Sequence, residues 1–177
     1  MYPKELSVQE DQGAEKAKEE RKVEKEKNDA LSLRRIEKFL SNSSTYLGAL
    51  YLDSFKKMSI KAKIYSVIVF CDNHWFAIFS TPTTFEIFDS LGFLQKRKCI
   101  NSIFMAFLKS QLGKKVLYAN PQIQSNKSFA CGYFAAFFII NREAGLSFNE
   151  ILSKFSKNFR KNEHLAKLFL DNKLSSK

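Results

Sequence analysis

Cysteine, histidine and long apolar runs are all scarce in this sequence, and each shortage argues against a class of protein. Three widely spaced cysteines do not suggest a disulfide framework, so we expect a reducing interior compartment. Only two histidines occur, without the spacing of metal-ligand pairs, so we expect no metal site. The longest apolar run covers Phe129 to Ile140, which is too short to cross a bilayer and instead predicts a buried helix. We therefore expect no membrane partner.

The start of the chain also lacks the pattern of a secretory signal. Its first residues, MYPKELSVQEDQ, do not combine a basic start with an apolar segment, so we expect no secretory signal and no secretion. The chain has no internal repeats, and 177 residues suffice for one domain with a proper core.

Charge divides the chain into two parts. Residues 1–30 carry 7 Lys and Arg against 9 Asp and Glu, with almost no apolar side chains, which predicts a disordered arm or a solvated helix. Residues 31–177 hold the remaining 22 basic and 9 acidic residues, a net charge of +13. A domain this basic attracts polyanions, nucleic acid first among them, although a basic surface can also serve solubility alone.

The apolar pattern of residues 31–177 predicts an α+β fold, with a central, mostly antiparallel sheet and helices around it. Short turns separate the first three strands, which favours antiparallel neighbours. The expected strands cover residues 63–70, 74–80, 85–89 and 115–119. The expected helices cover residues 31–40, 96–112, 128–142, 148–159 and 162–172, and Ser147 with Glu150 predicts a capping box for the fourth.

Cys131 is the first candidate for chemistry. It lies where the polar loop of residues 120–128 enters the apolar helix, so we expect it at a helix N-terminus. The helix dipole and the free backbone N–H groups there favour the thiolate, which is the reactive form. Gly132 beside it would let a substrate backbone approach. The alternative is an ordinary buried cysteine.

His74 is the better candidate for a base. It opens a strand after a polar turn, and Trp75 beside it could form one wall of a site. The other histidine, His164, lies in a charged helix and is expected to be only solvated. An ordinary His-Trp pair on an edge strand is the alternative.

Asp89 and Gln124 could complete a site with these residues. Asp89 ends the strand after that of His74, so its carboxylate could orient the imidazole. Glu86 is a rival, but strand alternation points it to the opposite face, and we expect Asp89 to be the more exposed of the two. Gln124 lies seven residues before Cys131 and could donate to an oxyanion.

Together these elements resemble the adenovirus protease (adenain) group, whose wider clan includes the ubiquitin-like-protein proteases. The matching residues are His74-Trp75, Asp89 within IFDSLGF, Gln124, and the run Ala130 to Phe134. Upstream, IEKFLSNSSTYLGALYLDSF is similar to the family's first helix and following loop, so the resemblance covers about residues 32–140.

The resemblance implies an adenain-like cysteine protease domain over residues 31–177, with Cys131 as nucleophile, His74 as base, Asp89 as orienting acid and Gln124 as oxyanion donor. It also implies cleavage of viral structural precursor proteins at glycine-containing sites during virion maturation, with DNA or a short peptide as activator and no cofactor for the chemistry itself. We expect Trp75 and Gly132 to bind substrate. The expected location is the virion and the host nucleus or another intracellular compartment, and we expect a monomer.

The chain departs from the adenovirus enzymes at three points. Its acid is Asp rather than Glu, no cysteine matches the one that tethers the activating peptide, and residues 1–30 have no equivalent. These departures favour a relative from another DNA virus or a virus-like element. Two rival functions stay open: an isopeptidase for ubiquitin-like modifiers, and a basic nucleic-acid-binding module on an inactive protease fold.

Overall fold

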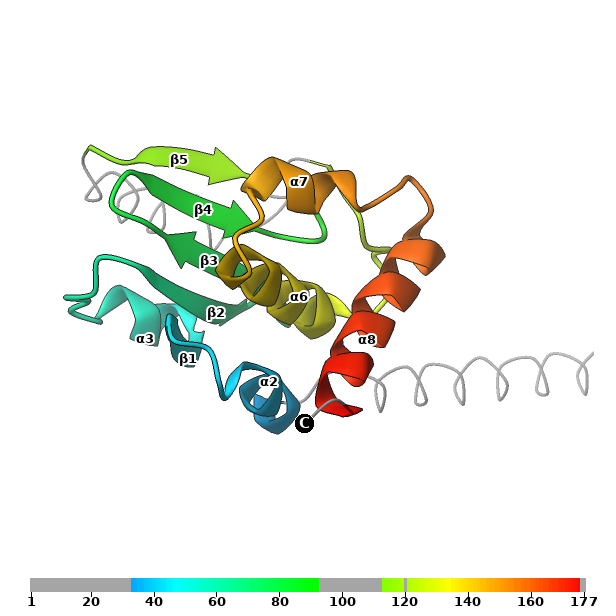
Figure 1. Cartoon of the computed structure of the whole chain (residues 1–177), viewed down its shortest axis with the longest axis horizontal. Helices are drawn as coiled ribbons and strands as arrows, with labels where there is room; N and C mark the ends of the chain where they lie inside the picture. The colour runs from blue at the N-terminus through cyan, green and yellow to red at the C-terminus, as the bar shows by residue number, and fades with distance from the viewer. Residues whose placement is uncertain (1–32, 93–112, 120, 176–177) are drawn as a thin grey trace, which may run out of the picture. The chain divides into compact units, whose positions relative to one another are not determined.

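A five-stranded sheet with helices packed on it forms the domain (Figure 1). The computed structural model describes residues 33–92, 113–119 and 121–175. The sheet has the order β1-β2-β3-β4-β5, with strands β1 (Tyr46–Tyr51), β2 (Tyr65–Cys71), β3 (His74–Ser80), β4 (Thr84–Phe88) and β5 (Lys115–Tyr118). The helices described are α2 (Leu33–Leu40), α3 (Leu52–Lys56), α6 (Cys131–Glu143), α7 (Phe148–Ser153) and α8 (Phe159–Ser175).

The middle three strands are antiparallel, as the short turns predict. β2 and β3 pair over their full length across a two-residue turn, and β3 then pairs with β4. Both residues of the first turn, Asp72 and Asn73, have positive φ, the conformation that a tight hairpin requires. The outer strands β1 and β5 instead run parallel to their neighbours.

Each face of the sheet packs against helices. Helices α2, α6, α7 and α8 cover one face, where Phe134 and Phe138 pack with side chains of β2 to β4. Helix α3 contributes Leu52 and Phe55 to the cluster on the other face. Helix α6 lies directly on the sheet, with α8 crossing beyond it (Figure 1). It is buried from Cys131 to Asn141, so the prediction of a buried helix is confirmed.

The main differences from the predicted elements lie in the first and last thirds of the domain. Residues 46–56 form β1 and α3 rather than a loop, because Gly48 (φ 128°) and a register irregularity hide the strand's alternation. Helix α7 ends at Ser153, and α8 begins at Phe159. The predicted break between these two helices, near residue 160, therefore lies several residues too late in the chain. The helix predicted over residues 96–112, and the boundary predicted at residue 30, lie outside the described residues.

The predicted capping box starts α7. The Ser147 hydroxyl accepts a hydrogen bond from the Glu150 backbone N–H at 3.3 Å, and the Glu150 carboxylate accepts one from the Ser147 N–H at 2.7 Å. These bonds satisfy two N–H groups that a helix start would otherwise leave without partners. Hydrogen bonds to the Glu150 carboxylate from the Ser147 hydroxyl and the Ser147 backbone N–H lower the pKa of Glu150.

A buried ion pair fastens the last turn of α6 to β4. Arg142 Nε and Nη2 donate to the two carboxylate oxygens of Glu86 at 2.7 and 3.0 Å, and Arg142 Nη1 donates to the Leu146 carbonyl. The Glu86 side chain is 3% exposed and that of Arg142 is 14% exposed. Since α6 carries Cys131 at its other end, this pair helps to hold the helix in place on the sheet.

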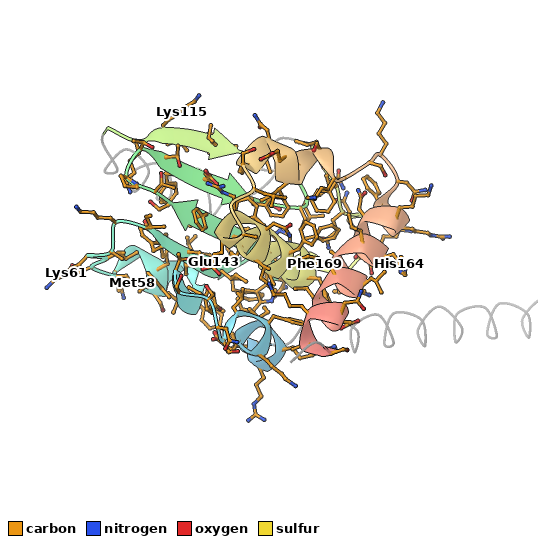
Figure 2. All side chains as sticks on the ribbon, viewed as in Figure 1. Met58, Lys61, Lys115, Glu143, His164 and Phe169 are labelled. Carbon is orange, nitrogen blue, oxygen red and sulfur yellow. The ribbon has the colours of Figure 1, made fainter. Side chains whose placement is uncertain are left out.

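We expect Glu86→Ala to lower the free energy of unfolding by about 3 kcal/mol, because it leaves the Arg142 guanidinium buried without its carboxylate. Urea denaturation followed by circular dichroism measures the change. Lys115→Ala, an exposed site on β5 (Figure 2), is the control and should change stability by less than about 0.5 kcal/mol. An unfolding midpoint equal to that of the wild type would show that the ion pair contributes nothing.

Candidate active site

Three predicted site residues come from different elements and meet at one end of the sheet. His74 is the first residue of β3, and Asp89 directly follows the last residue of the antiparallel strand β4. Because antiparallel neighbours begin and end at opposite edges, the start of β3 lies beside the end of β4. Cys131 is the first residue of α6, and it lies in contact with His74.

His74 and Asp89 form a short, buried pair. His74 Nε2 lies 2.6 Å from Asp89 Oδ1, and the two side chains are 3% and 2% exposed. The same carboxylate oxygen accepts the Leu91 backbone N–H at 2.9 Å, which fixes the rotamer of Asp89. Since Nε2 faces the carboxylate, Nδ1 is the ring nitrogen left for Cys131. This arrangement holds the imidazole in one orientation.

Cys131 is a free thiol in a setting that favours its ionised form. Burial alone would raise its pKa, but the hydrogen bond and charge of His74, together with the backbone N–H groups of Trp75 and Gly132, lower the pKa below the usual thiol value. No side chain caps α6, whose N-cap residue is Ala130. The positive end of the helix dipole therefore adds to the stabilisation of a thiolate.

The pKa of His74 moves in the opposite direction. Burial alone would lower it, but the hydrogen bonds to Asp89 and Cys131 and the negative charges of these partners raise it above the usual imidazole value. A lowered thiol pKa beside a raised imidazole pKa favours a thiolate–imidazolium pair over the neutral pair. Such a pair supplies a nucleophile and a proton donor together.

Gln124 is buried in the loop before α6, and both ends of its amide have partners. Its Oε1 accepts a hydrogen bond of 2.5 Å from the Ser90 hydroxyl, and its Nε2 donates to the Ser128 carbonyl at 2.8 Å. The primary amide nitrogen carries two hydrogens, and this bond uses one of them. The Gln124 side chain is therefore held firmly in the loop that leads to Cys131.

Side chains of helix α8 also hydrogen-bond to this loop. Asn162 Nδ2 donates to the Ile123 carbonyl at 2.9 Å, and Glu163 accepts a hydrogen bond of 2.7 Å from the Ser128 hydroxyl. No sequence signal pointed to these supporting residues, because they lie more than thirty positions from their partners. Ser90 was not among the predicted site residues, although its position directly after Asp89 could have indicated that it lies in the site.

Trp75 and Gly132, the predicted substrate-binding residues, lie beside Cys131 and donate backbone N–H groups to its sulfur. The Trp75 ring is partly buried and packs on Phe70 of β2, with ring centroids 4.6 Å apart. Tyr51 of β1 continues the row, 5.5 Å from Phe70, and is 68% exposed. An aromatic row thus crosses three strands and ends at Trp75, the residue whose backbone N–H bonds the Cys131 sulfur.

For Glu86 and Asp89, the predicted direction of the side chain is confirmed but the predicted exposure is not. Glu86 pairs with Arg142, far from His74, as strand alternation predicts. The expectation that Asp89 is the more exposed is wrong, since Asp89 is 1% exposed and Glu86 is 2% exposed. Asp89 is buried because the chain turns back over it, with the Gly92 N–H donating to the Asp89 carbonyl at 3.1 Å.

A further correction concerns Cys71 at the end of β2. It is disulfide-bonded, although the number and wide spacing of the cysteines did not suggest a disulfide framework. The spacing of cysteines along a chain does not determine which sulfur atoms meet in the fold. His164 is exposed on α8 (Figure 2), as expected.

The described part of the chain has neither a metal-binding cluster nor a membrane-spanning helix. Within residues 33–92, 113–119 and 121–175, no group of three or more His, Cys, Asp and Glu side chains could hold a metal ion. In the same part of the chain, no helix is long and apolar enough to span a membrane.

Comparisons with known proteins give a fold but no family. No family model matches the chain, and no curated protein sequence does. Among solved structures, the ASFV pS273R protease aligns with a TM-score of 0.54 and 17% identity, over 76% of this chain and 64% of that one. The chain thus spans less than two thirds of that protease. At this identity the likeness is one of fold.

Two other solved structures also align with this chain. The central domain of the uncharacterized Lpg1148 protein from Legionella pneumophila aligns with a TM-score of 0.51 and 12% identity, over 82% of this chain and 98% of that one. The Ulp1 protease domain, solved in complex with Smt3, the yeast ortholog of SUMO, aligns with a TM-score of 0.42 and 16% identity, over 80% and 77%. The chain therefore has the mixed α+β fold that the ASFV protease also has.

Proposed function

We propose that this protein is a cysteine endopeptidase in which Cys131 is the nucleophile. The observation that carries the proposal is the buried set of Cys131, His74 and Asp89, with a lowered thiol pKa and a raised imidazole pKa. A buried carboxylate, imidazole and thiol in contact are costly to maintain and suit nucleophilic catalysis. The fold shared with the ASFV protease supports the same reading.

In the proposed reaction, the Cys131 thiolate attacks the carbonyl carbon of the scissile peptide bond. The carbonyl oxygen becomes an oxyanion, which the Gln124 Nε2 and backbone N–H groups at the start of α6 stabilise. The His74 imidazolium gives its proton to the leaving amine, and a thioester with Cys131 remains. Water, deprotonated by His74, then hydrolyses the thioester and restores the thiolate. Asp89 keeps the ring oriented throughout.

The site also favours a particular kind of substrate. The Trp75 backbone N–H bonds the Cys131 sulfur. We propose that the ring of the same residue restricts the size of the residues next to the scissile bond, which suits the glycine-containing sites implied by the resemblance to adenovirus proteases. The aromatic row of Trp75, Phe70 and Tyr51 would support an extended polypeptide. We propose viral structural precursor proteins as substrates, cleaved during virion maturation in the virion, the host nucleus or another intracellular compartment.

DNA is the activator that the charge distribution supports. Exposed basic side chains gather at the start of α8 and just before it, at Lys154, Lys157, Arg160 and Lys161. Such a group neutralises phosphate charges and makes binding depend on salt. We propose that DNA stimulates cleavage by a monomer, whereas a peptide activator has no support beyond the resemblance.

Alkylation of Cys131 tests the proposed function directly. At about pH 6 an ordinary thiol is mostly protonated, so iodoacetamide should modify Cys131 at least about tenfold faster than it modifies N-acetylcysteine amide. His74→Ala should remove this advantage, because the imidazolium lowers the pKa of the thiol. Mass spectrometry locates the modified residue, and the rates are measured with and without duplex DNA.

The outcomes separate the functions that stay open. Acceleration only with DNA indicates an activator-dependent enzyme. Labelling no faster than that of the model thiol under both conditions, together with salt-sensitive DNA binding, would favour the inactive binding module. Strong capture by a ubiquitin-like-modifier probe with a reactive C-terminus, without cleavage of glycine-containing peptides, would favour the isopeptidase.

A further inference from the structure

Ser90 joins the two halves of the candidate site. It directly follows Asp89, and it makes three hydrogen bonds to the loop that carries Gln124. The Ser90 carbonyl accepts the backbone N–H groups of Ile123 and Gln124, both at 2.9 Å, and the Ser90 hydroxyl donates to Gln124 Oε1 at 2.5 Å. Ser90 is 2% exposed, so water does not compete for these bonds.

The two partners of the Gln124 amide have different roles in fixing which way it faces. An amide side chain can place its oxygen and nitrogen in either of two orientations, which differ by half a turn. In this site, the Ser128 carbonyl can only accept, so it requires the amide nitrogen on its side. The Ser90 hydroxyl donates to the amide oxygen on the other side. The Ser128 carbonyl therefore selects the orientation of the amide. The Ser90 hydroxyl holds the amide there by giving the buried Oε1 a donor, which keeps Nε2 in the loop leading to Cys131.

We propose that Ser90 is a positioning residue that holds the Gln124 amide in place for oxyanion stabilisation. This inference rests on the proposed function, in which Gln124 donates to the oxyanion. Without the Ser90 hydroxyl, Gln124 Oε1 is a buried acceptor that has lost its partner, and the amide can rotate to seek another. A rotated or mobile amide no longer presents its N–H at the required point. Because oxyanion stabilisation depends on donors held in place beforehand, the rate of acyl transfer falls.

Two reactions of the same sulfur separate this role from a general disturbance of the site. In acylation by p-nitrophenyl acetate, the thiolate attacks the ester carbonyl, an oxyanion forms, a C–S bond replaces the C–O bond and p-nitrophenolate leaves. In alkylation by iodoacetamide, the thiolate displaces iodide and no oxyanion forms. Loss of oxyanion stabilisation therefore slows the first reaction only, whereas damage to the Cys131–His74 pair slows both.

The test measures both rates at Cys131 in the full-length chain. We expect Ser90→Ala to slow acylation about tenfold while alkylation stays within about twofold of the wild type, and Gln124→Ala to slow acylation by about 10²-fold, the usual effect of removing an oxyanion donor. In the double variant, Ser90→Ala should add less than about twofold to the effect of Gln124→Ala, because both remove the same interaction.

Ser80→Ala is the matched control. Ser80 is also a fully buried serine, and its hydroxyl accepts a hydrogen bond from Lys114 Nζ at 2.7 Å. It lies at the opposite end of β3 from His74, so it should leave both rates unchanged. This control accounts for the general cost of removing a buried hydroxyl.

The remaining outcomes are decisive. Unchanged acylation in Ser90→Ala, additive effects in the double variant, or equal slowing of both reactions would overturn the role of Ser90. A wild-type Cys131 that alkylates no faster than a model thiol, both with and without duplex DNA, would overturn the proposed function itself, so the two failures are distinguishable.

Discussion

Replacing Cys131 by alanine should reduce peptide and ester hydrolysis to the background rate, a loss of about 10⁴-fold or more. The reason is direct: the variant has no sulfur to form the thioester, and among the described residues Cys131 is the free cysteine in contact with His74. The measurements are the hydrolysis of p-nitrophenyl acetate and the cleavage of a pool of glycine-containing peptides, read by mass spectrometry.

A second variant keeps the result interpretable. Cys131→Ser preserves the size of the side chain but replaces the thiol with a hydroxyl that is far less acidic. It should fold like the wild type by circular dichroism and still lose almost all activity, because His74 is arranged to hold a thiolate. Cleavage by purified Cys131→Ala at more than about one hundredth of the wild-type rate would contradict the assignment.

Asp89→Asn should slow catalysis near neutral pH by about 10- to 10³-fold and change its pH dependence. The Asp89 oxygen that faces His74 Nε2 also accepts the Leu91 N–H, so the amide oxygen of Asn can take this position and accept from both groups. The ring therefore keeps its orientation and its tautomer. The neutral amide, however, supplies no negative charge to stabilise the imidazolium that Cys131 needs beside it.

The charges of Asp89 and His74 determine in which direction the Asp89→Asn variant shifts the pH midpoint of Cys131 alkylation. The Asp89 carboxylate raises the pKa of His74, and the resulting imidazolium lowers the pKa of Cys131. Without the carboxylate, the thiolate should form only at higher pH, so the midpoint of alkylation rate against pH should move toward that of an ordinary thiol. Glu86→Gln, a buried carboxylate paired with Arg142, is the control and should leave the midpoint unchanged. An unchanged midpoint in Asp89→Asn would show that Asp89 does not act on the pair.

Local sequence features anticipated much of the domain because the forces behind them act over short distances. The polar turn at Asp72 and Asn73 predicted the β2–β3 hairpin, and the Ser147–Glu150 spacing predicted the start of α7. The apolar run after Cys131 predicted the buried helix α6. Each signal comes from neighbouring residues that form the element together.

Other elements could not be anticipated in this way. Strand β1 lacks a clear alternation and is stabilised by its parallel pairing with β2, a contact between residues about twenty positions apart. Helix α8 starts earlier than its pattern suggests, since buried Asn162 ties the chain at Ser156 to the helix, with its Oδ1 accepting the Ser156 N–H at 2.8 Å. Their limits depend on packing rather than on local preference.

The sequence by itself determined the set of candidate residues, because residue type and position at a strand or helix end already limit which side chains can do acyl-transfer chemistry. Only the tertiary structure decided that His74, Asp89 and Cys131 meet, that Glu86 pairs with Arg142 instead, and that Ser90 holds Gln124. The physical reason is that hydrogen bonds and ion pairs act over a few ångströms, and the fold alone brings residues far apart in the chain within that range.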